Sequence, residues 1–505
     1  MCRLRLYTIV FIVFVTVSLL GCKEQDMLVI DASSGIELQH SLYDSFASRK
    51  QVISFSSEGD AYRILFGNNR VFLVLKDRIP LISISDSGYW VINEKKTGCN
   101  VGVDTSGLII LPSISLGEKG TWLIDNQDTG VIADNDYYYQ VICKDNRCIY
   151  SIVQIESNLY CYTMAGEMLC IPIVTNPLYR FPAYFENHIL EKELKAEEAI
   201  IESNGSSVSF VFFTDAHWGR NRKHSPALIK HIVDYTPLDR VFFGGDVITN
   251  YYTDPEDALQ LGFDFQRSFS FMSSSFYCVF GNHDDNATGQ SSALENHLSD
   301  EQVYSYLQSQ MNDVVYGPFF NFYFDDEESQ TRFICLDTGR LYLSQNRSFT
   351  SQTARYVINV LESVPQGWHI IAISHIWTNL VNQETGECKE SSYVRPIIGL
   401  LEDYNERKTG MFDYGGVTYG YDFSSASGRV EFCLGGHTHA DYIVISDGGI
   451  PLITLTSDGP VEVAGTPFVS NSVLEQCVGI FVTDYSNRKL HIIHVGRGND
   501  RVLSI

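Results

Sequence analysis

Two patterns of apolar and polar positions divide the chain. Up to about residue 185, short apolar runs are separated by Gly, Asn and Asp, which is typical of β-strands joined by tight turns. After about residue 207, near-continuous apolar runs alternate with segments whose apolar residues recur at helical spacing. These patterns predict a β-rich N-terminal module over residues 46–185 and an α/β domain over residues 207–505.

The strands predicted in the α/β domain are almost uninterrupted apolar runs, so we expect sheets buried on both faces. They lie at 208–214, 241–243, 276–280, 333–336, 370–373 and 430–434. Between them, Ser225 and Pro226 suit the cap and first turn of a helix, and Ser299 with Gln302 resembles a capping box. Ligands of such folds bind at the carboxyl ends of the strands.

The N-terminal module contains an internal repeat. Segment 88–93, Gly-Tyr-Trp-Val-Ile-Asn, matches segment 120–125, Gly-Thr-Trp-Leu-Ile-Asp, and Thr-Gly follows each at the same spacing. Repeats of this period usually mark stacked supersecondary units. We interpret Trp90 and Trp122 as hairpin core residues rather than contacts for a glycan or surface partner, because aromatic residues in repeats usually pack inward.

A charged helical segment separates the two regions. Residues 190–201 have helical character, and Asn204-Gly-Ser-Ser207 interrupts the pattern. We therefore predict a helical linker over residues 186–206.

The first residues have the pattern of a signal peptide, with Arg3 and Arg5 before an uncharged apolar run that is short for a membrane span. The sequence Leu19-Leu-Gly-Cys22 resembles the bacterial lipoprotein box, which implies removal of residues 1–21 and lipidation of Cys22. The polar residues 22–45 are then predicted to be a tether. We expect a lipid-anchored protein of the cell envelope, at the outer membrane and exposed on the surface.

Composition removes some alternatives. Hydrophobic residues make up 44% of the 505 positions, so the chain is able to build full cores. A formal net charge of −25 leaves no basic excess, so no stable nucleic-acid binding is expected. The pairs Cys143 with Cys148 and Cys161 with Cys170 fit disulfides in an oxidising compartment, and free thiols fit equally well.

Side chains of metal-binding type follow five of the predicted strands. They are Asp215, His217, Asp246, Asn282, His375, His437 and His439. Carboxylate, amide and imidazole groups without thiolate suit one or two divalent ions such as Mn, Fe, Zn or Ni. We expect the Asp-x-His and His-x-His pairs each to aim two side chains at one ion, because alternate residues of a strand project to the same side.

Taken in order, these motifs resemble those of the calcineurin-like metallophosphoesterases. The matching segments are Asp215-Ala-His217, Gly245-Asp246, Gly281-Asn282-His283-Asp284, Ser374-His375 and Gly436-His437-Thr438-His439. The resemblance covers about 300 residues from Val208 onward. It implies a sandwich of two mixed β-sheets flanked by helices, and hydrolysis of phosphate monoesters or diesters.

The same resemblance implies roles for the site residues. One of two divalent ions would be bound by Asp215, His217 and His439. The other would be bound by Asn282, His375 and His437, with Asp246 bridging both. A hydroxide between the ions would attack phosphorus, and His283 would contact the substrate and protonate the leaving group.

Three residues near these motifs each have two readings. Asp284 would either orient His283 or cap its own loop. Arg220 and Arg222 would either hold the phosphate ester or belong to a solvated basic loop.

Two classes of function follow. The first is a lipid-anchored phosphoesterase that acts outside the cytoplasm, with a nucleotidase or nuclease as a variant that the acidic balance disfavours. The second is a surface binding or adhesion lipoprotein whose phosphoesterase domain is vestigial. The complete set of seven ligand-type residues favours the enzyme.

Overall fold

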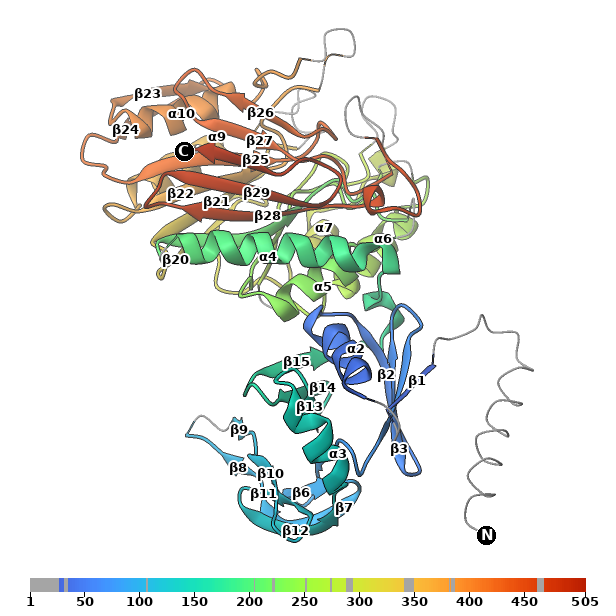
Figure 1. The fold of residues 1–505 in the computed structure, drawn as a ribbon. Coiled ribbons are helices and arrows are strands. Elements are labelled where there is room, and N and C mark those ends of the chain that lie inside the picture. The colour runs from blue at the N-terminus through green and yellow to red at the C-terminus, as the bar shows by residue number, and fades with distance from the viewer. Residues whose placement is uncertain are drawn as a thin grey trace. The chain divides into compact units, whose positions relative to one another are not determined.

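The structure is a computed structural model that forms two compact units, divided between Ala183 and Tyr184. It describes residues 27–30, 35–105, 108–203, 205–219, 223–249, 252–272, 275–287, 294–339, 349–380, 382, 387–460 and 467–505. The N-terminal unit is rich in short strands, and the C-terminal unit combines larger sheets with helices (Figure 1). Among the described residues, no helix has the length and apolar character needed to span a membrane.

The described residues of the N-terminal unit form four sheets. Their strand orders are β1-β4-β3-β2, β15-β14-β13-β5-β6-β7, β10-β11-β12 and β8-β9. The strands are β1 (Met27–Ile30), β2 (Val52–Glu58), β3 (Ala61–Phe66), β4 (Val71–Leu75), β5 (Leu81–Ile84), β6 (Tyr89–Ile92), β7 (Lys95–Asn100), β8 (Gly102–Val103), β9 (Ile109–Ile110), β10 (Ile114–Leu116), β11 (Thr121–Ile124), β12 (Gln127–Ile132), β13 (Ile149–Ile155), β14 (Asn158–Thr163) and β15 (Met168–Pro172). Two helices, α2 (Ile36–Ala47) and α3 (Asn135–Gln140), accompany them.

Helix α2 lies largely within the segment predicted to be a tether. Its Leu42 and Phe46 are buried in the core of the N-terminal unit, and the Phe46 ring lies 5.4 Å from that of Phe66. Strand β1 also falls in this segment and pairs in parallel with β4. Folded structure therefore begins before residue 46, because apolar positions of a mainly polar segment find partners in the sheet.

The two matching segments of the N-terminal unit form the hairpins β6–β7 and β11–β12, which share their local bonds. Thr97 Oγ1 donates to the Trp90 carbonyl at 2.7 Å, and Thr129 Oγ1 donates to the Trp122 carbonyl at 2.6 Å. Both indole rings are fully buried in one hydrophobic cluster. The two tryptophans are core residues, so a glycan or surface partner of this unit would contact other side chains.

No disulfide joins any of the ten cysteines in the described part of the chain. The β14–β15 register explains this for one pair, since Cys161 lies opposite Leu169 whereas Cys170 lies opposite Tyr160. Neighbouring residues of a strand point to opposite faces, so Cys161 is buried on one face and Cys170 is exposed on the other. A bond between them would require the strands to rearrange.

The C-terminal unit is built around two mixed sheets. Their strand orders are β18-β17-β16-β28-β29-β30 and β19-β20-β21-β22-β25-β27-β26. Strand β16 is parallel to β17 and antiparallel to β28. Phe210 of the first sheet and Phe333 of the second belong to one buried cluster, with ring centres 5.6 Å apart. The predicted α/β fold with two mixed sheets is confirmed.

The bounds of these elements follow. The strands of the first sheet are β16 (Ser207–Phe213), β17 (Val241–Phe243), β18 (Phe276–Cys278), β28 (Cys477–Asp484), β29 (Lys489–Gly496) and β30 (Arg501–Ser504). Those of the second are β19 (Val315–Tyr316), β20 (Phe322–Asp326), β21 (Thr331–Leu336), β22 (His369–Ser374), β25 (Arg429–Gly435), β26 (Tyr442–Ile445) and β27 (Pro451–Thr454), and a separate hairpin consists of β23 (Thr409–Tyr414) and β24 (Val417–Asp422). The helices are α4 (Glu186–Glu202), α5 (Ser225–Tyr235), α6 (Pro255–Ser268), α7 (Asp300–Leu307), α9 (Ser351–Glu362) and α10 (Arg395–Asn405).

Two helix starts test the sequence predictions. The capping box at Ser299 and Gln302 is present at the start of α7. Ser225, however, is the first residue of α5 rather than its cap, because His224 occupies the cap position. The Ser225 hydroxyl instead bonds to Asp458 and Gln476, more than 200 residues away in the sequence.

Helix α4 covers part of the first sheet, along β28 and β29 (Figure 1). Its Glu193 is fully buried and lies 2.7 Å from Nδ1 of His231 on α5. Lys192 and Lys195 both donate to Asp500, at 2.7 and 2.9 Å. The segment predicted to be a linker is thus a packed part of the C-terminal unit.

We expect residues 184–505 to fold without the N-terminal unit, whereas residues 205–505, which lack α4, should be less stable. Without α4, His231 loses the hydrogen-bond partner Glu193, a change that typically costs about 1–3 kcal/mol, and the strands that α4 covers lose apolar contacts. Urea unfolding of the two fragments, followed by circular dichroism, measures the difference. Equal unfolding midpoints would mean that α4 is dispensable.

Candidate metal centre

The candidate ligands lie in loops at the carboxyl ends of strands from both sheets. Asp215 and His217 follow β16, Asp246 follows β17, Asn282 follows β18, His375 follows β22, and His437 and His439 follow β25. Main-chain bonds tie the loops together, since the Asp215 N–H donates to the Gly245 carbonyl at 2.9 Å and the Gly436 N–H donates to the His375 carbonyl at 3.0 Å. Candidate ligands far apart in the sequence are thereby brought together at the carboxyl ends of the strands.

Five of these residues have a left-handed backbone. Their φ angles are 52° at Asp215, 44° at His217, 64° at Asp246, 69° at His437 and 54° at His439. Residues other than glycine rarely adopt this conformation, which costs about 1–3 kcal/mol and persists only where the surroundings enforce it. The expectation that alternation along a strand aims these side chains is therefore wrong. Strand β16 ends at Phe213, and turns beyond the strand ends aim the ligands.

Two glycines of the motifs let these loops touch. A Cβ atom on Gly281 would lie 2.2 Å from the Asp246 nitrogen, and one on Gly436 would lie 2.3 Å from Asp215 Oδ2. A larger residue at Gly281 would have to displace the main chain of Asp246. One at Gly436 would have to displace the side chains of Thr214 and Asp215. The glycines are therefore needed for close approach to the two carboxylates.

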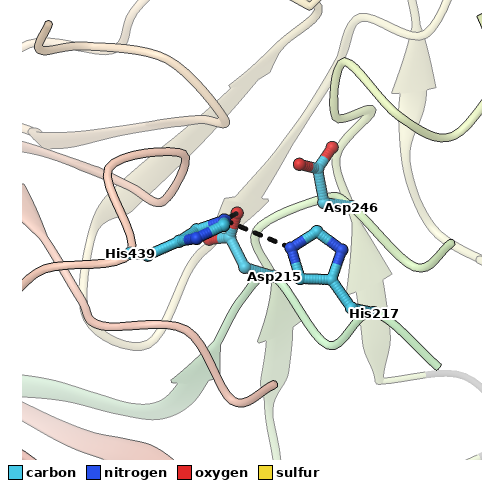
Figure 2. A group of neighbouring side chains, drawn as sticks. All are labelled: Asp215, His217, Asp246 and His439. Atoms are coloured by element: carbon cyan, nitrogen blue, oxygen red, sulfur yellow. Dashed lines mark hydrogen bonds and ion pairs between the residues drawn. The ribbon is translucent and has the colours of Figure 1, made fainter. Parts of the chain in front are cut away.

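Asp215, His217, Asp246 and His439 form a compact cluster (Figure 2). Each offers one ligand atom, and these atoms all lie within 4.8 Å of one another. His439 Nε2 is 3.2 Å from both Asp215 Oδ1 and His217 Nε2. His217 Nδ1 faces the Ile248 carbonyl at 3.3 Å, which leaves Nε2 for the cluster.

A second group borders the same carboxylates. His375 Nε2 lies 3.2 Å from Asp246 Oδ2 and 3.9 Å from Asp215 Oδ1, while its Nδ1 faces the Gly244 carbonyl at 2.7 Å. The His437 ring lies 5.3 Å from that of His375. Asp246 therefore stands between the His217 and His375 sides, where a bridging ligand is predicted.

Orphaned polar atoms show that this donor set fits cations. Among the described residues, buried Asn282 Oδ1 has no hydrogen-bond partner, and Asp246 Oδ2 and His375 Nε2 face each other at ion-pair distance. Buried polar atoms usually have full sets of partners, so these three neighbouring atoms have bonding capacity that a bound cation would use. Carboxylate, amide oxygen and imidazole are ligands suited to divalent metal ions.

The motifs and their geometry agree with one family. The family model described as calcineurin-like phosphoesterase matches residues 208–441. These residues form a calcineurin-like phosphoesterase domain. No curated protein sequence matches the chain.

Solved structures provide a weaker comparison. A dimetal phosphatase from Danio rerio is 13% identical, with 59% of this chain and 98% of that chain covered and a TM-score of 0.38. A protein of Thermus thermophilus is 9% identical, with 57% and 98% covered and a TM-score of 0.29. At these scores the structures add nothing to the family match.

Several side chains of the buried cluster in the phosphoesterase domain have shifted pKa values that favour their charged forms. Burial raises the pKa of Asp215, but His439 and His375 outweigh it and lower that pKa to about 2. Burial lowers the pKa of His217 to about 4, against the attraction of Asp246. Burial also opposes charge on His375, yet Asp246 and Asp215 raise its pKa to about 9. A metal ion bound here would therefore displace a proton from His375.

His283 borders the cluster. Its side chain is 20% exposed, and its Nε2 lies 3.7 Å from Asp246 Oδ2. Its main-chain N–H donates to Asp246 Oδ1 at 2.9 Å, and its ring lies 5.5 Å from that of His217. This position beside the carboxylates, reachable from solvent, fits the substrate contact predicted for His283.

Asp284 holds the main chain of two loops together. Its Oδ2 accepts from the N–H groups of Gly281 at 2.7 Å and Asp246 at 3.1 Å, and its Oδ1 accepts from Val247 at 2.7 Å. Burial and the charge of Asp246 raise its pKa to about 8. Both oxygens bond to the main chain, so capping of the loop describes Asp284 better than orientation of His283.

Some predicted residues lie outside the described part of the phosphoesterase domain and of the chain. These are Arg220 and Arg222, assigned to substrate binding, and Cys22, assigned to lipidation. Their roles stay predictions.

Sequence patterns missed two supports of the site. Asn286 is fully buried, donates to the carbonyls of Tyr252 at 2.9 Å and Asn296 at 2.8 Å, and so joins the Gly281–Asp284 loop to its neighbours. Residues 456–459 follow β27 and bond to loops that carry ligands. Residues 456–459 could have been found in the sequence, because they are a polar run directly after an apolar strand. Asn286 could not, because a single asparagine forms no pattern.

We expect Asp284→Asn to loosen the centre, because an amide keeps one acceptor oxygen and turns an NH2 group toward main-chain donors. The free energy of unfolding should fall by about 1–3 kcal/mol, and the amount of Mn²⁺ retained should fall with it. Urea unfolding and elemental analysis measure both. Asp239→Asn is the matched control, since that side chain is 73% exposed. If Asp284→Asn matches the control in both measurements, Asp284 does not hold the loops.

Proposed function

We propose that the chain hydrolyses phosphate monoesters or diesters outside the cytoplasm with two divalent metal ions. The observation that carries the proposal is the cluster of four ligand atoms within 4.8 Å of one another, on a domain of the phosphoesterase family. A second ion is supported by Asn282 Oδ1, which is buried without a partner among the described residues, and by His375 Nε2, which lies 3.2 Å from Asp246 Oδ2.

The proposal assigns a task to each group of ligands. Asp215, His217 and His439 would hold one ion, Asn282, His375 and His437 the other, and Asp246 both. Such ions neutralise charge on a phosphate ester and make a water molecule acidic enough to attack it. The main-chain bonds to Gly244 and Ile248 fix which ring nitrogens of His375 and His217 face the centre.

His283 would act on the substrate itself. Its ring stands beside Asp246 and is partly exposed, so an ester bound at the cluster would meet it. A protonated ring can donate a hydrogen bond to a phosphate oxygen or a proton to the leaving oxygen. No serine or cysteine nucleophile is required by this assignment.

Removal of the metal ions and the substitution Asp246→Asn test the proposed function. Wild-type protein with Mn²⁺ is expected to hydrolyse aryl phosphate monoesters, diesters or nucleotides, and a chelator should abolish this reversibly. Asp246→Asn should lower kcat by about 10³-fold, because a loss of several kcal/mol of charge stabilisation has that effect. Asp239→Asn, an exposed Asp→Asn change at the opposite end of β17, should keep full activity.

Two results would overturn the proposal. One is wild-type protein without bound divalent ions that leaves all three substrate classes intact in added Mn²⁺, which is the behaviour of a vestigial domain on a binding lipoprotein. The other is Asp246→Asn with activity within a few-fold of wild type.

We further infer that the chain is anchored by lipid at Cys22, from the resemblance of Leu19–Cys22 to the lipoprotein box. Cys22→Ala should move the protein from the membrane fraction to the soluble fraction of the cell envelope. Cys143→Ala, a change at an exposed cysteine, should leave it in the membrane. Continued membrane partition of Cys22→Ala would indicate an uncleaved anchor instead.

A further inference from the structure

Residues 456–459, Thr-Ser-Asp-Gly, touch two loops that carry ligands. Thr456 Oγ1 donates to the His439 carbonyl at 2.6 Å. Ser457 Oγ and the Gly459 N–H both donate to the Asp215 carbonyl, at 2.8 and 3.1 Å. We call these four residues the 456–459 clamp.

The clamp grips residues whose backbone is strained. Asp215 and His439 have φ angles of 52° and 54°, and they are the ligands joined by the 3.2 Å contact between Oδ1 and Nε2. In such a turn, a small rotation of the peptide swings the side chain away from its target. A bond to the carbonyl of the same residue opposes that rotation, and strain of this kind persists only where neighbours enforce it.

The clamp is itself anchored from behind. Arg497 is buried, and its Nη2 donates to the carbonyls of Ser457 and, at 2.5 Å, Gly459. The Asp458 carboxylate accepts from the Ser225 hydroxyl and, at 3.0 Å, from the Cys477 N–H. The clamp is thus fixed to the start of α5 and to the end of β28 nearest the site.

We propose that Thr456 and Ser457, with Arg497 behind them, are positioning residues that set the distance between Asp215 and His439 and hence the affinity for a divalent ion. The inference rests on the proposed metal function. It concerns residues beyond the 208–441 segment that the family model matches. None of the three is a ligand, since each acts through the main chain of a ligand residue or of the clamp.

Thr456→Val tests the clamp because it keeps the shape of the side chain and removes the donor to His439. We expect the full chain to bind Mn²⁺ about 10-fold more weakly, as for other residues that support ligands. Thr456→Ser, which keeps a hydroxyl, should restore binding close to the wild-type value. Ser457→Ala, which frees the Asp215 carbonyl of one donor, should weaken binding as well.

Thr483→Val is the matched control. Thr483 is fully buried on β28, and its hydroxyl has no hydrogen-bond partner in the described part of the chain. It pairs with Val208 at the end of β16 away from the site. Equilibrium dialysis with Mn²⁺ gives the dissociation constants, and thermal unfolding of the metal-free proteins shows whether each variant is folded. The control should bind Mn²⁺ like wild type.

The outcomes separate the clamp from the proposed function. Weaker binding in Thr456→Val that Thr456→Ser restores supports the clamp. Wild-type affinity in both Thr456→Val and Ser457→Ala overturns the clamp and leaves the metal function standing. Weaker binding that Thr456→Ser does not restore also overturns it, because the effect is then general destabilisation. Wild-type protein that binds no Mn²⁺ overturns the proposed function and the clamp together.

Discussion

The arrangement of loops in the C-terminal unit depends on the burial of two carboxylates. Asp215 and Asp246 are both fully buried, and a charge removed from water costs several kcal/mol unless it is paired and hydrogen bonded. Main-chain N–H groups of His437 and His283 donate to them, and His439 and His375 lie within ion-pair distance. To deliver these groups, loops from both sheets must meet at one edge, with glycines where they touch. The strained turns, the close approaches and the supporting bonds all serve that requirement.

The sequence predicted the parts of the site that depend on residue type and on strand ends. Side chains such as Asp215 and His439 carry their chemistry wherever they are placed, and an apolar strand before each fixes the edge of the sheet at which it emerges. The division into two mixed sheets was implied by the family resemblance, whereas the burial of sheets on both faces was predicted from near-continuous apolar runs such as 208–214. These inferences need only local patterns.

Features that depend on tertiary contact escaped prediction. The left-handed turns at Asp215 and His217 are stabilised by distant residues. The alternation of side chains along a strand therefore does not describe how these two ligands are aimed. Helix α4 looks like a linker because it is charged, yet Glu193 finds a buried partner in His231. The sequence left two roles open for Asp284, orientation of His283 or capping of its own loop, and its three main-chain donors favour the second. In each case the deciding partner lies many residues away.

The pairing of β16 with β28 has a consequence for folding during synthesis. β16, which leads to Asp215, lies antiparallel to β28, so Ser207 pairs with Asp484. During translation or transport through a membrane, the chain emerges from its N-terminus, and β16 must wait for some 270 further residues before this neighbour exists. All seven candidate ligands precede β28, so the first sheet is still incomplete when they emerge. A divalent ion would therefore meet the complete first sheet only where residues 477–484 arrive.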